Sequence, residues 1–178
     1  MASKEPSPQH IPTPAEFHKV IAERSDRWYS ACLRITKDPD LAADAVQDAL
    51  LNAWRKRHQF DHNAQLDTWI HRIAINAALQ LLRKRKPDRW GPMPPDPADE
   101  TSLPETEQTT RELERSLGTA MHELSEMEQV CFVLKHLEQW RLAEIADQLN
   151  VNVGTIKQAL FRGVKKLRVG MADLRSTA

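Results

Sequence analysis

The sequence predicts an all-α protein with two small helical domains joined by an extended, acidic and proline-rich linker. Apolar residues recur at helical spacing in both halves of the chain, and sustained period-2 alternation is missing. Six prolines fall between residues 87 and 108, a stretch that cannot form a regular hydrogen-bond ladder. The chain of 178 residues is 40% hydrophobic and 28% charged, as is usual for globular proteins.

These patterns divide the chain into four segments. Residues 1–13 are polar and proline-rich, so we expect a disordered N-terminal tail. We expect a first helical domain over residues 14–86, a flexible linker over 87–108 and a second helical domain over 109–178. No signal peptide and no long apolar run is present, so we expect a cytoplasmic protein without membrane insertion.

Charge is unevenly placed, although the whole chain is neutral. Residues 1–90 hold 15 Lys and Arg against 11 Asp and Glu, and residues 125–178 hold 8 against 6. Residues 91–124 hold 2 against 8. Two mildly basic blocks therefore flank an acidic connector, which allows DNA binding by local patches but predicts weak autonomous affinity.

The first domain reads as three helices. Asp38 followed by Pro39 is an N-cap acid before proline at the first helical position. The second helix carries an apolar stripe in which we expect Val46 and Leu50 to be core. The expected helices are Pro14–Ile35, Pro39–Arg57 and Asp67–Lys84, with a loop over His58–Leu66 and a basic run over Arg83–Lys86.

The second domain begins with two expected helices, Thr109–Leu124 and Glu126–Glu138, the latter started by a Ser125-x-x-Glu128 capping box. Leu142–Arg168 then has the spacing of a helix-turn-helix. Its first helix covers Leu142–Leu149, and its second starts near Val153.

Two details support the helix-turn-helix. Ala146 is small where the helices must cross, and Asn150 tolerates the left-handed backbone that the turn needs. The second helix is strongly basic, which suits the DNA major groove; the alternative is a surface helix with a solvated basic face. Its cations are Lys157, Arg162, Lys165, Lys166 and Arg168.

Two segments together resemble the extracytoplasmic-function (ECF) sigma factors of the sigma-70 family. The first, DPDLAADAVQDALLNAWRKRHQF with LDTWIHRIAINAALQLLRKRK, is similar to their region 2. The second, ELSEMEQVCFVLKHLEQWRLAEIADQLNVNVGTIKQALFRGVKKLR, is similar to their region 4. The resemblance implies an alternative sigma factor that binds core RNA polymerase, recognises −10 and −35 promoter elements and promotes DNA melting, in a stress or signal response.

The resemblance implies a polymerase-binding row on the second helix. An acid and amide row beside an apolar stripe suits docking onto a basic coiled coil. The alternative is that Trp54 is core and the acids form a solvated face. The implied core-polymerase-binding residues are Asp44, Gln47, Asp48, Leu51 and Trp54.

The loop and third helix match the part of the family that contacts the −10 element. Melting needs pockets and stacking groups for extruded bases, and cations for the unpaired backbone. Asn76 can pair with a base edge and Arg72 can hold phosphate, while Trp69 is expected to pack in the core. The implied −10 residues are Phe60, Asp61, His62, Asn63, Gln65, Arg72, Asn76, Arg83 and Lys84.

The second helix of the helix-turn-helix matches the family's −35 reader. Asn152 and Thr155 either cap this helix or contact DNA. Ala159 stands where the family has Arg, which suggests a lost contact and a shifted −35 preference, and Gln139 stands where it has Gly. The implied −35 residues are Asn152, Thr155, Lys157, Gln158, Phe161, Arg162 and Lys165.

The implied partners are the β and β′ subunits of core polymerase, promoter DNA and an anti-sigma factor, with a monomer when free. We expect no enzymatic activity, catalytic residue, metal or cofactor. Cys32 and Cys131 lie in apolar contexts and are expected to pack as small hydrophobes. The alternatives are a stand-alone helix-turn-helix regulator and a sigma-like decoy. The linker either threads into the polymerase or is a passive spacer.

Overall fold

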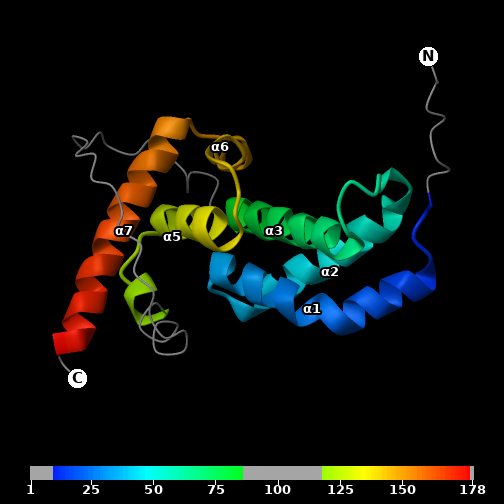
Figure 1. Cartoon of the computed structure of the whole chain (residues 1–178), viewed down its shortest axis with the longest axis horizontal. Coiled ribbons are helices and arrows are strands. Elements are labelled where there is room, and N and C mark those ends of the chain that lie inside the picture. The colour runs from blue at the N-terminus through cyan, green and yellow to red at the C-terminus, as the bar shows by residue number, and fades with distance from the viewer. Residues whose placement is uncertain (1–9, 86–117, 177–178) are drawn as a thin grey trace, which may run out of the picture. The chain divides into compact units, whose positions relative to one another are not determined.

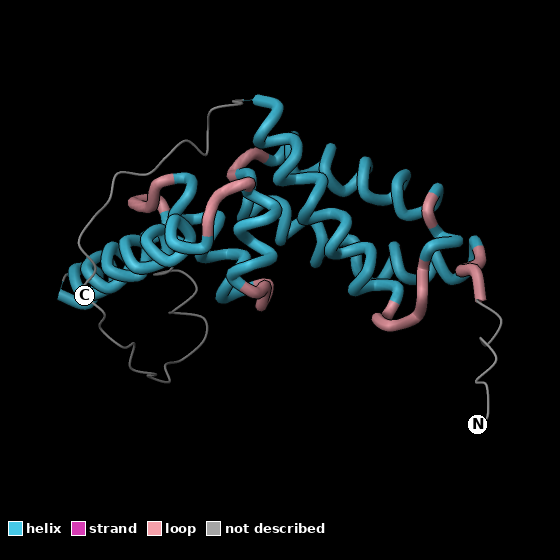
Figure 2. The backbone as a smooth tube through the Cα atoms, turned by 90° about the horizontal axis from the view of Figure 1, so that it is seen from above, coloured by secondary structure: helices cyan, strands magenta, loops and turns pink. Residues whose placement is uncertain are grey.

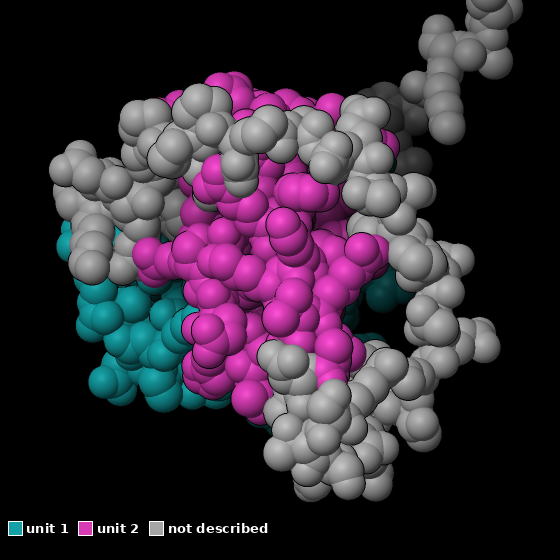
Figure 3. All heavy atoms as spheres, turned by 90° about the vertical axis from the view of Figure 1, so that its left-hand side faces the viewer, with its two compact units in different colours: residues 1–87 teal, residues 88–178 magenta. Residues whose placement is uncertain are grey.

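The computed structural model describes residues 10–85 and 118–176, which contain helices and no strand (Figure 1, Figure 2). The chain divides into two compact units, residues 1–87 and 88–178, coloured separately in Figure 3. The all-α fold with two helical domains is confirmed. The predicted linker lies outside the described residues. Within the described ranges no helix is long and apolar enough to cross a membrane.

Unit 1 contains three α-helices that all contact one another, α1 (Pro14–Thr36), α2 (Pro39–Arg55) and α3 (Leu66–Arg85), with a short 3-10 turn η1 (Arg57–Gln59) after α2. The predicted helix over Pro39–Arg57 therefore ends two residues early. α1 begins with a capping box between Thr13 and Glu16, and ends at Lys37 with φ 54°. Asp38 then caps α2 by accepting the Asp40 and Leu41 N–H groups, as predicted.

The face of α2 that packs on the other two helices is built from small residues. Ala42, Ala45, Ala49 and Ala53 are fully buried, and they let the helices approach closely. Large side chains fill the core from α1 and α3: Trp28, Ile35, Ile70, Ile75, Leu79 and Leu82. The prediction that Val46 and Leu50 are core is wrong, because the alanine stripe holds the centre of the contact and leaves both side chains half-buried at its edge.

A buried carboxylate joins α1 to α3. Asp67, in the first turn of α3, accepts a hydrogen bond from Trp28 Nε1 at 3.1 Å. Its other oxygen lies 3.2 Å from Arg27 Nη1 and 3.5 Å from Arg24 Nε. Trp28 is fully buried and the Asp67 side chain is 11% exposed. The buried Trp28 N–H and the Asp67 carboxylate therefore both have partners, and this contact fixes the register of the two helices.

A second tie joins the end of α3 to the start of α2. Arg85 Nη1 lies 2.7 Å from Asp38 Oδ2. The Leu41 N–H, followed by Arg85, holds the pKa of Asp38 below its usual value. The pair is open to solvent, so its stabilising contribution is small. Arg85, within the predicted basic run, is therefore engaged inside the domain.

Unit 2 is built from α5 (Glu126–Phe132), a π-helical turn η2 (Val133–Leu137), α6 (Leu142–Leu149) and α7 (Val153–Ser176). The Ser125–Glu128 capping box is confirmed. The predicted helix over Glu126–Glu138 is wrong in its last part, because the ladder widens to π geometry and Glu138 N–H bonds to Val133 O. This widening is followed by Gln139 at φ 59° and by Trp140, whose ring is buried.

The predicted helix over Thr109–Leu124 lies partly outside the described residues. In its described part the helix ends at Met121 rather than Leu124, since tight i→i+3 bonds turn the chain toward the Ser125 cap.

One face of α7 packs on α5 and α6. Ile156, Ala159 and Leu167 are buried on it. Near the end of α7, a Cβ built on Gly170 would lie 3.3 Å from the Cβ of Ala120. A small residue is therefore needed there.

We predict that Asp67→Ala lowers the free energy of unfolding by about 3 kcal/mol, because it leaves the buried Trp28 N–H unpaired. Asp67→Asn keeps an acceptor for that N–H and should cost about 1 kcal/mol. Urea denaturation followed by circular dichroism measures both, with Asp26→Ala, an exposed acid on α1, as the control. Equal losses from the two Asp67 variants would contradict the assigned role of the Trp28 hydrogen bond.

Candidate functional site

The predicted polymerase-binding residues form one exposed face of α2, opposite the buried alanine stripe. Asp44, Gln47 and Asp48 are exposed. Leu51 is 49% exposed and Trp54 is 37% exposed, which is unusual for side chains of this size. The face thus combines two acids, an amide and two large apolar groups, an arrangement that suits a protein partner.

Trp54 is exposed but firmly held. The Phe17 ring lies edge-on to it at 5.2 Å between centroids. The Arg57 guanidinium lies 4.1 Å from the Trp54 ring centroid, and its Nη1 donates to the Trp54 carbonyl at 2.8 Å. The alternative that Trp54 is core is therefore wrong. Its ring is pre-ordered by contacts on both sides, which lowers the entropy cost of docking.

The loop between η1 and α3 exposes four of its five predicted −10 residues: Asp61, His62, Asn63 and Gln65. Asp61 accepts from the Asn63 backbone N–H at 3.1 Å and from Asn63 Nδ2 at 2.6 Å. The Asn63 N–H, followed by its amide, lowers the pKa of Asp61.

Phe60 does not line an open base pocket. It is 5% exposed, and its ring packs 4.4 Å from His62 and 5.3 Å from Trp69 between centroids. The prediction that Phe60 helps to line a pocket for an extruded base is therefore wrong for this structure. The Phe60 ring instead packs against the rings of His62 and Trp69. Trp69, which was expected in the core, is half-buried.

The cleft beside this loop differs from the predicted base pocket. It has a volume of about 280 Å³ and lies between α1 and the start of α3. Of the predicted −10 residues only Gln65 lines it, together with Lys19, Arg24 and Asp67 among others. Asp61, His62 and Asn63 instead lie on an open surface.

On α3, Arg72 is exposed and Asn76 is half-buried one turn further on. The Asn76 Oδ1 atom is buried and accepts no hydrogen bond from the described residues. Bidentate pairing with a base edge therefore requires the amide to turn outward. Further along, Arg83 is half-buried and Lys84 is exposed, while Lys86 lies outside the described residues.

The turn of the helix-turn-helix has the predicted geometry. Asn150 has φ 55°, and the following Val151 N–H bonds to Ala146 O at 3.0 Å. Asn152 Oδ1 accepts from the Thr155 N–H at 2.8 Å and from its hydroxyl at 3.1 Å. Of the two alternatives for these residues, the structure therefore shows the helix cap. The cap engages the Asn152 side-chain oxygen and the Thr155 hydroxyl.

The solvent face of α7 carries four exposed side chains at i, i+4, i+8 and i+11: Lys157, Phe161, Lys165 and Arg168. Gln158 and Arg162 flank this stripe and are half-buried. Three cations and one aromatic ring on a single face of a helix suit a DNA groove.

Two residues of α7 that the sequence assigned to the DNA side contact other residues of unit 2 instead. Lys166 Nζ lies 2.8 Å from Glu128 Oε2, whose side chain is 4% exposed. Ala159 is fully buried. The suggestion that Ala159 costs a DNA contact is therefore wrong, because this position faces the domain interior.

The described residues show no reactive site. Burial, followed by the Glu128 charge, raises the pKa of the Cys131 thiol to about 12, so it stays protonated and inert. The buried Cys32 thiol donates to Ala74 O at 3.5 Å. Within the described ranges, no three His, Cys, Asp or Glu side chains gather closely enough to hold a metal ion.

Family models match both units. Sigma-70 region 2 matches residues 20–87, and Sigma-70 region 4 matches residues 114–167. The chain is 29% identical over 168 residues to the ECF RNA polymerase sigma factor SigW of Bacillus subtilis, covering 89% of this chain and 90% of SigW. The chain belongs to the ECF sigma factors. As a sigma factor, it takes part in promoter recognition and transcription initiation.

Other relatives agree. This sigma factor is 30% identical over 161 residues to the ECF RNA polymerase sigma factor SigG of Mycobacterium tuberculosis, covering 77% of its own chain but 44% of SigG. Its fold is similar to that of RpoE from Bartonella quintana, solved with the anti-sigma factor NepR. The TM-score is 0.56 at 20% identity, with coverage of 88% of this chain and 97% of RpoE. It is also similar to CnrH, solved with the cytosolic domain of CnrY, at a TM-score of 0.51 and 20% identity, covering 93% and 92% of the two chains.

Sequence reasoning missed three residues that shape these surfaces. Phe17 and Arg57 hold Trp54. His10, in the segment predicted to be disordered, contacts His62 in the loop predicted to bind the −10 element. The only available signal was the Thr13-x-x-Glu16 spacing of a capping box, which marks where order begins.

We predict that the neighbouring cations Lys165 and Lys166 separate DNA binding from stability. Lys165→Ala should weaken −35 duplex binding by the holoenzyme and reduce the salt slope by about 1, with unchanged stability. Lys166→Ala should leave that slope unchanged and cost about 1–3 kcal/mol of folding free energy, because the buried Glu128 carboxylate loses its cationic partner. Salt titrations and thermal unfolding measure both. A loss of salt slope in Lys166→Ala would contradict the assignment.

Proposed function

We propose that this sigma factor docks on core RNA polymerase, at its β and β′ subunits, through the exposed face of α2. The observation that carries the proposal is that the predicted row of Asp44, Gln47, Asp48, Leu51 and Trp54 is exposed as one face. Two acids favour a basic partner helix, while Leu51 and the held Trp54 ring offer apolar anchors.

The loop ahead of α3 then contacts the −10 element. Its exposed His62, Asn63 and Gln65 supply one ring and two amides for unpaired bases, above the Phe60 ring. Arg72 and Lys84 on α3 supply cations for the backbone. Melting follows because these groups bind the separated strand and not the duplex.

The exposed stripe of α7 reads the −35 element. Lys157 lies in the first helical turns, where a recognition helix meets base edges, and Lys165 and Arg168 hold phosphates further along. Asn152 and Thr155 orient the helix end through their cap. Two moderate anchors on separate domains then act together, so neither domain needs strong affinity by itself.

An anti-sigma factor is the second proposed partner, since the similar RpoE was solved with the anti-sigma factor NepR and CnrH was solved with the cytosolic domain of CnrY. It would cover the exposed faces of α2 and α7 and withhold this sigma factor until a stress or other signal arrives. As a polymerase subunit it acts in the cytoplasm and catalyses no reaction of its own.

In vitro transcription tests the whole proposal. Purified chain is added to core polymerase with a library of promoters, and transcripts are sequenced. Initiation should shift to a promoter class with shared −10 and −35 elements. Failure to bind core, or unchanged initiation, would reject the proposal.

We predict that Asp48→Arg weakens core binding roughly tenfold or more, because it places a cation against a basic partner surface. Its exposed position predicts an unchanged thermal midpoint. Fluorescence anisotropy with core polymerase measures the affinity. Asp26→Arg, an equal charge change on exposed α1 surface, is the control and should bind normally.

We predict that Asn76→Ala reduces open-complex formation while leaving core binding unchanged. Because the variant removes a buried oxygen without a hydrogen bond in the described structure, folding stability should hold or rise. Permanganate footprinting and thermal unfolding measure the two effects. Normal opening would reject the role of Asn76 at the −10 element.

A further inference from the structure

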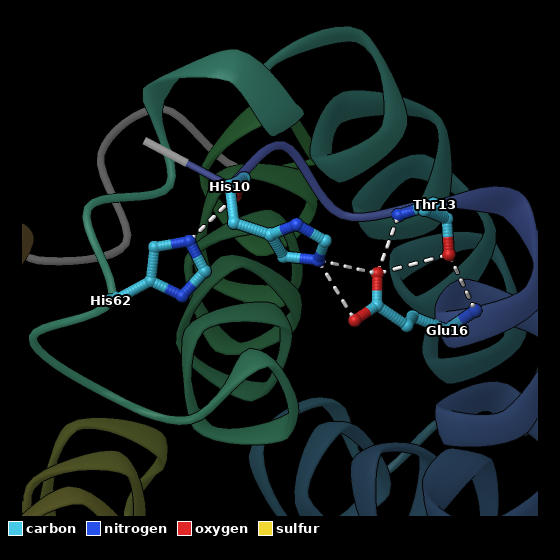
Figure 4. A network of polar contacts seen from close by, with 4 residues as sticks. All are labelled: His10, Thr13, Glu16 and His62. Atoms are coloured by element: carbon cyan, nitrogen blue, oxygen red, sulfur yellow. Dashed lines mark hydrogen bonds and ion pairs between the residues drawn. The ribbon is translucent and has the colours of Figure 1, made fainter. Parts of the chain in front are cut away.

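The segment before α1 contacts the −10 loop directly. His62 Nε2 lies 2.6 Å from the backbone carbonyl of His10, although 52 positions separate the two residues (Figure 4). A carbonyl oxygen only accepts, so Nε2 is the protonated nitrogen of the His62 ring. The His10 and His62 rings also lie 5.9 Å apart between centroids.

The segment itself is anchored to α1. The Glu16 carboxylate accepts from the Thr13 backbone N–H at 2.7 Å and from the Thr13 hydroxyl at 2.9 Å. His10 Nε2 lies 3.0 Å from the same carboxylate. The Thr13 N–H, followed by His10, lowers the pKa of Glu16 to about 2, so this acceptor stays ionised at working pH. Between these contacts Pro12 is buried.

His62 is consequently held from two sides. Its ring packs at 62° to the Phe60 ring below, and its Nε2 is bonded to the anchored segment. The residue has φ 59°, a left-handed backbone conformation that is uncommon for a residue with a Cβ. An exposed loop side chain normally samples several rotamers, and ordering it on binding lowers affinity.

We propose that residues 10–13 are a positioning element for the −10 loop, which pre-orders His62 for the unpaired promoter strand. This inference rests on the proposed role of that loop in melting. His10 is thus a positioning residue that acts through its main-chain carbonyl. Removing it should slow opening without altering core binding or −35 binding.

Two matched truncations isolate the contact. Deletion of residues 2–9 keeps His10 and its carbonyl. Deletion of residues 2–12 removes them but leaves Thr13 and Glu16 to cap α1, so the fold is retained. We expect the longer deletion to slow open-complex formation about fivefold, the size of one lost hydrogen bond, and the shorter deletion to behave like the full chain. Stopped-flow fluorescence of 2-aminopurine at the −10 element measures the rate in holoenzyme.

A double-mutant cycle separates positioning from a general loss of structure. His62→Ala alone should slow opening by at least as much as the longer deletion. If the segment acts through His62, the longer deletion in the His62→Ala background should add nothing, whereas a merely structural effect would add in full. Thermal midpoints of all four proteins serve as the folding control.

The outcomes are distinguishable. Normal opening by His62→Ala would reject the role of the loop, and with it that part of the proposed function. Slow opening by His62→Ala together with normal opening by the longer deletion would reject only the positioning role. Faster opening by the longer deletion would show that the segment covers the loop, and would also overturn the inference.

Discussion

The buried carboxylate of Asp67 is the interaction on which unit 1 depends. A carboxyl group that is nearly buried in a helical core needs polar partners, and here one indole N–H and two guanidinium groups of α1 provide them. This requirement fixes where α3 begins against α1. The loop over residues 60–65 ends directly before α3, so the same contact constrains where this loop emerges. His62 of the loop contacts the segment around His10.

α2 shows how a packing constraint creates a binding surface. Its inner face is made of alanines, so the neighbouring helices supply the bulk of the core. Two large apolar residues of α2, Leu51 and Trp54, lie on the outer face beside Asp44 and Asp48. A ring exposed in this way is useful for docking only when it is ordered. Phe17 on α1 and Arg57 in η1 provide that order by contacting the Trp54 ring.

α7 divides its residues in the same manner. Its packed stripe needs small or apolar side chains, and Ala159 belongs to that stripe. Lys166 lies at the boundary, close enough to α5 to neutralise Glu128. Lys157, Phe161, Lys165 and Arg168 are left for the solvent face. The adjacent residues Lys165 and Lys166 thus have different environments: Lys165 faces solvent and Lys166 pairs with Glu128. The rotation of α7 about its axis relative to α5 determines this difference.

The sequence by itself determined the helical architecture, the order of the two units and most helix ends, because these depend on local periodicity and on caps such as Asp38, Ser125 and Asn150. It also singled out the row of α2 that the structure shows exposed and that we propose as the polymerase-binding face. Only the tertiary structure decided that Phe60 and Ala159 are buried and that Val46 is half-buried. It also decided the pairing of Lys166 with Glu128 and the contact between His10 and His62. Periodicity identifies an apolar face but not its centre, which depends on the neighbouring helices. Contacts between residues far apart in sequence leave no local pattern at all.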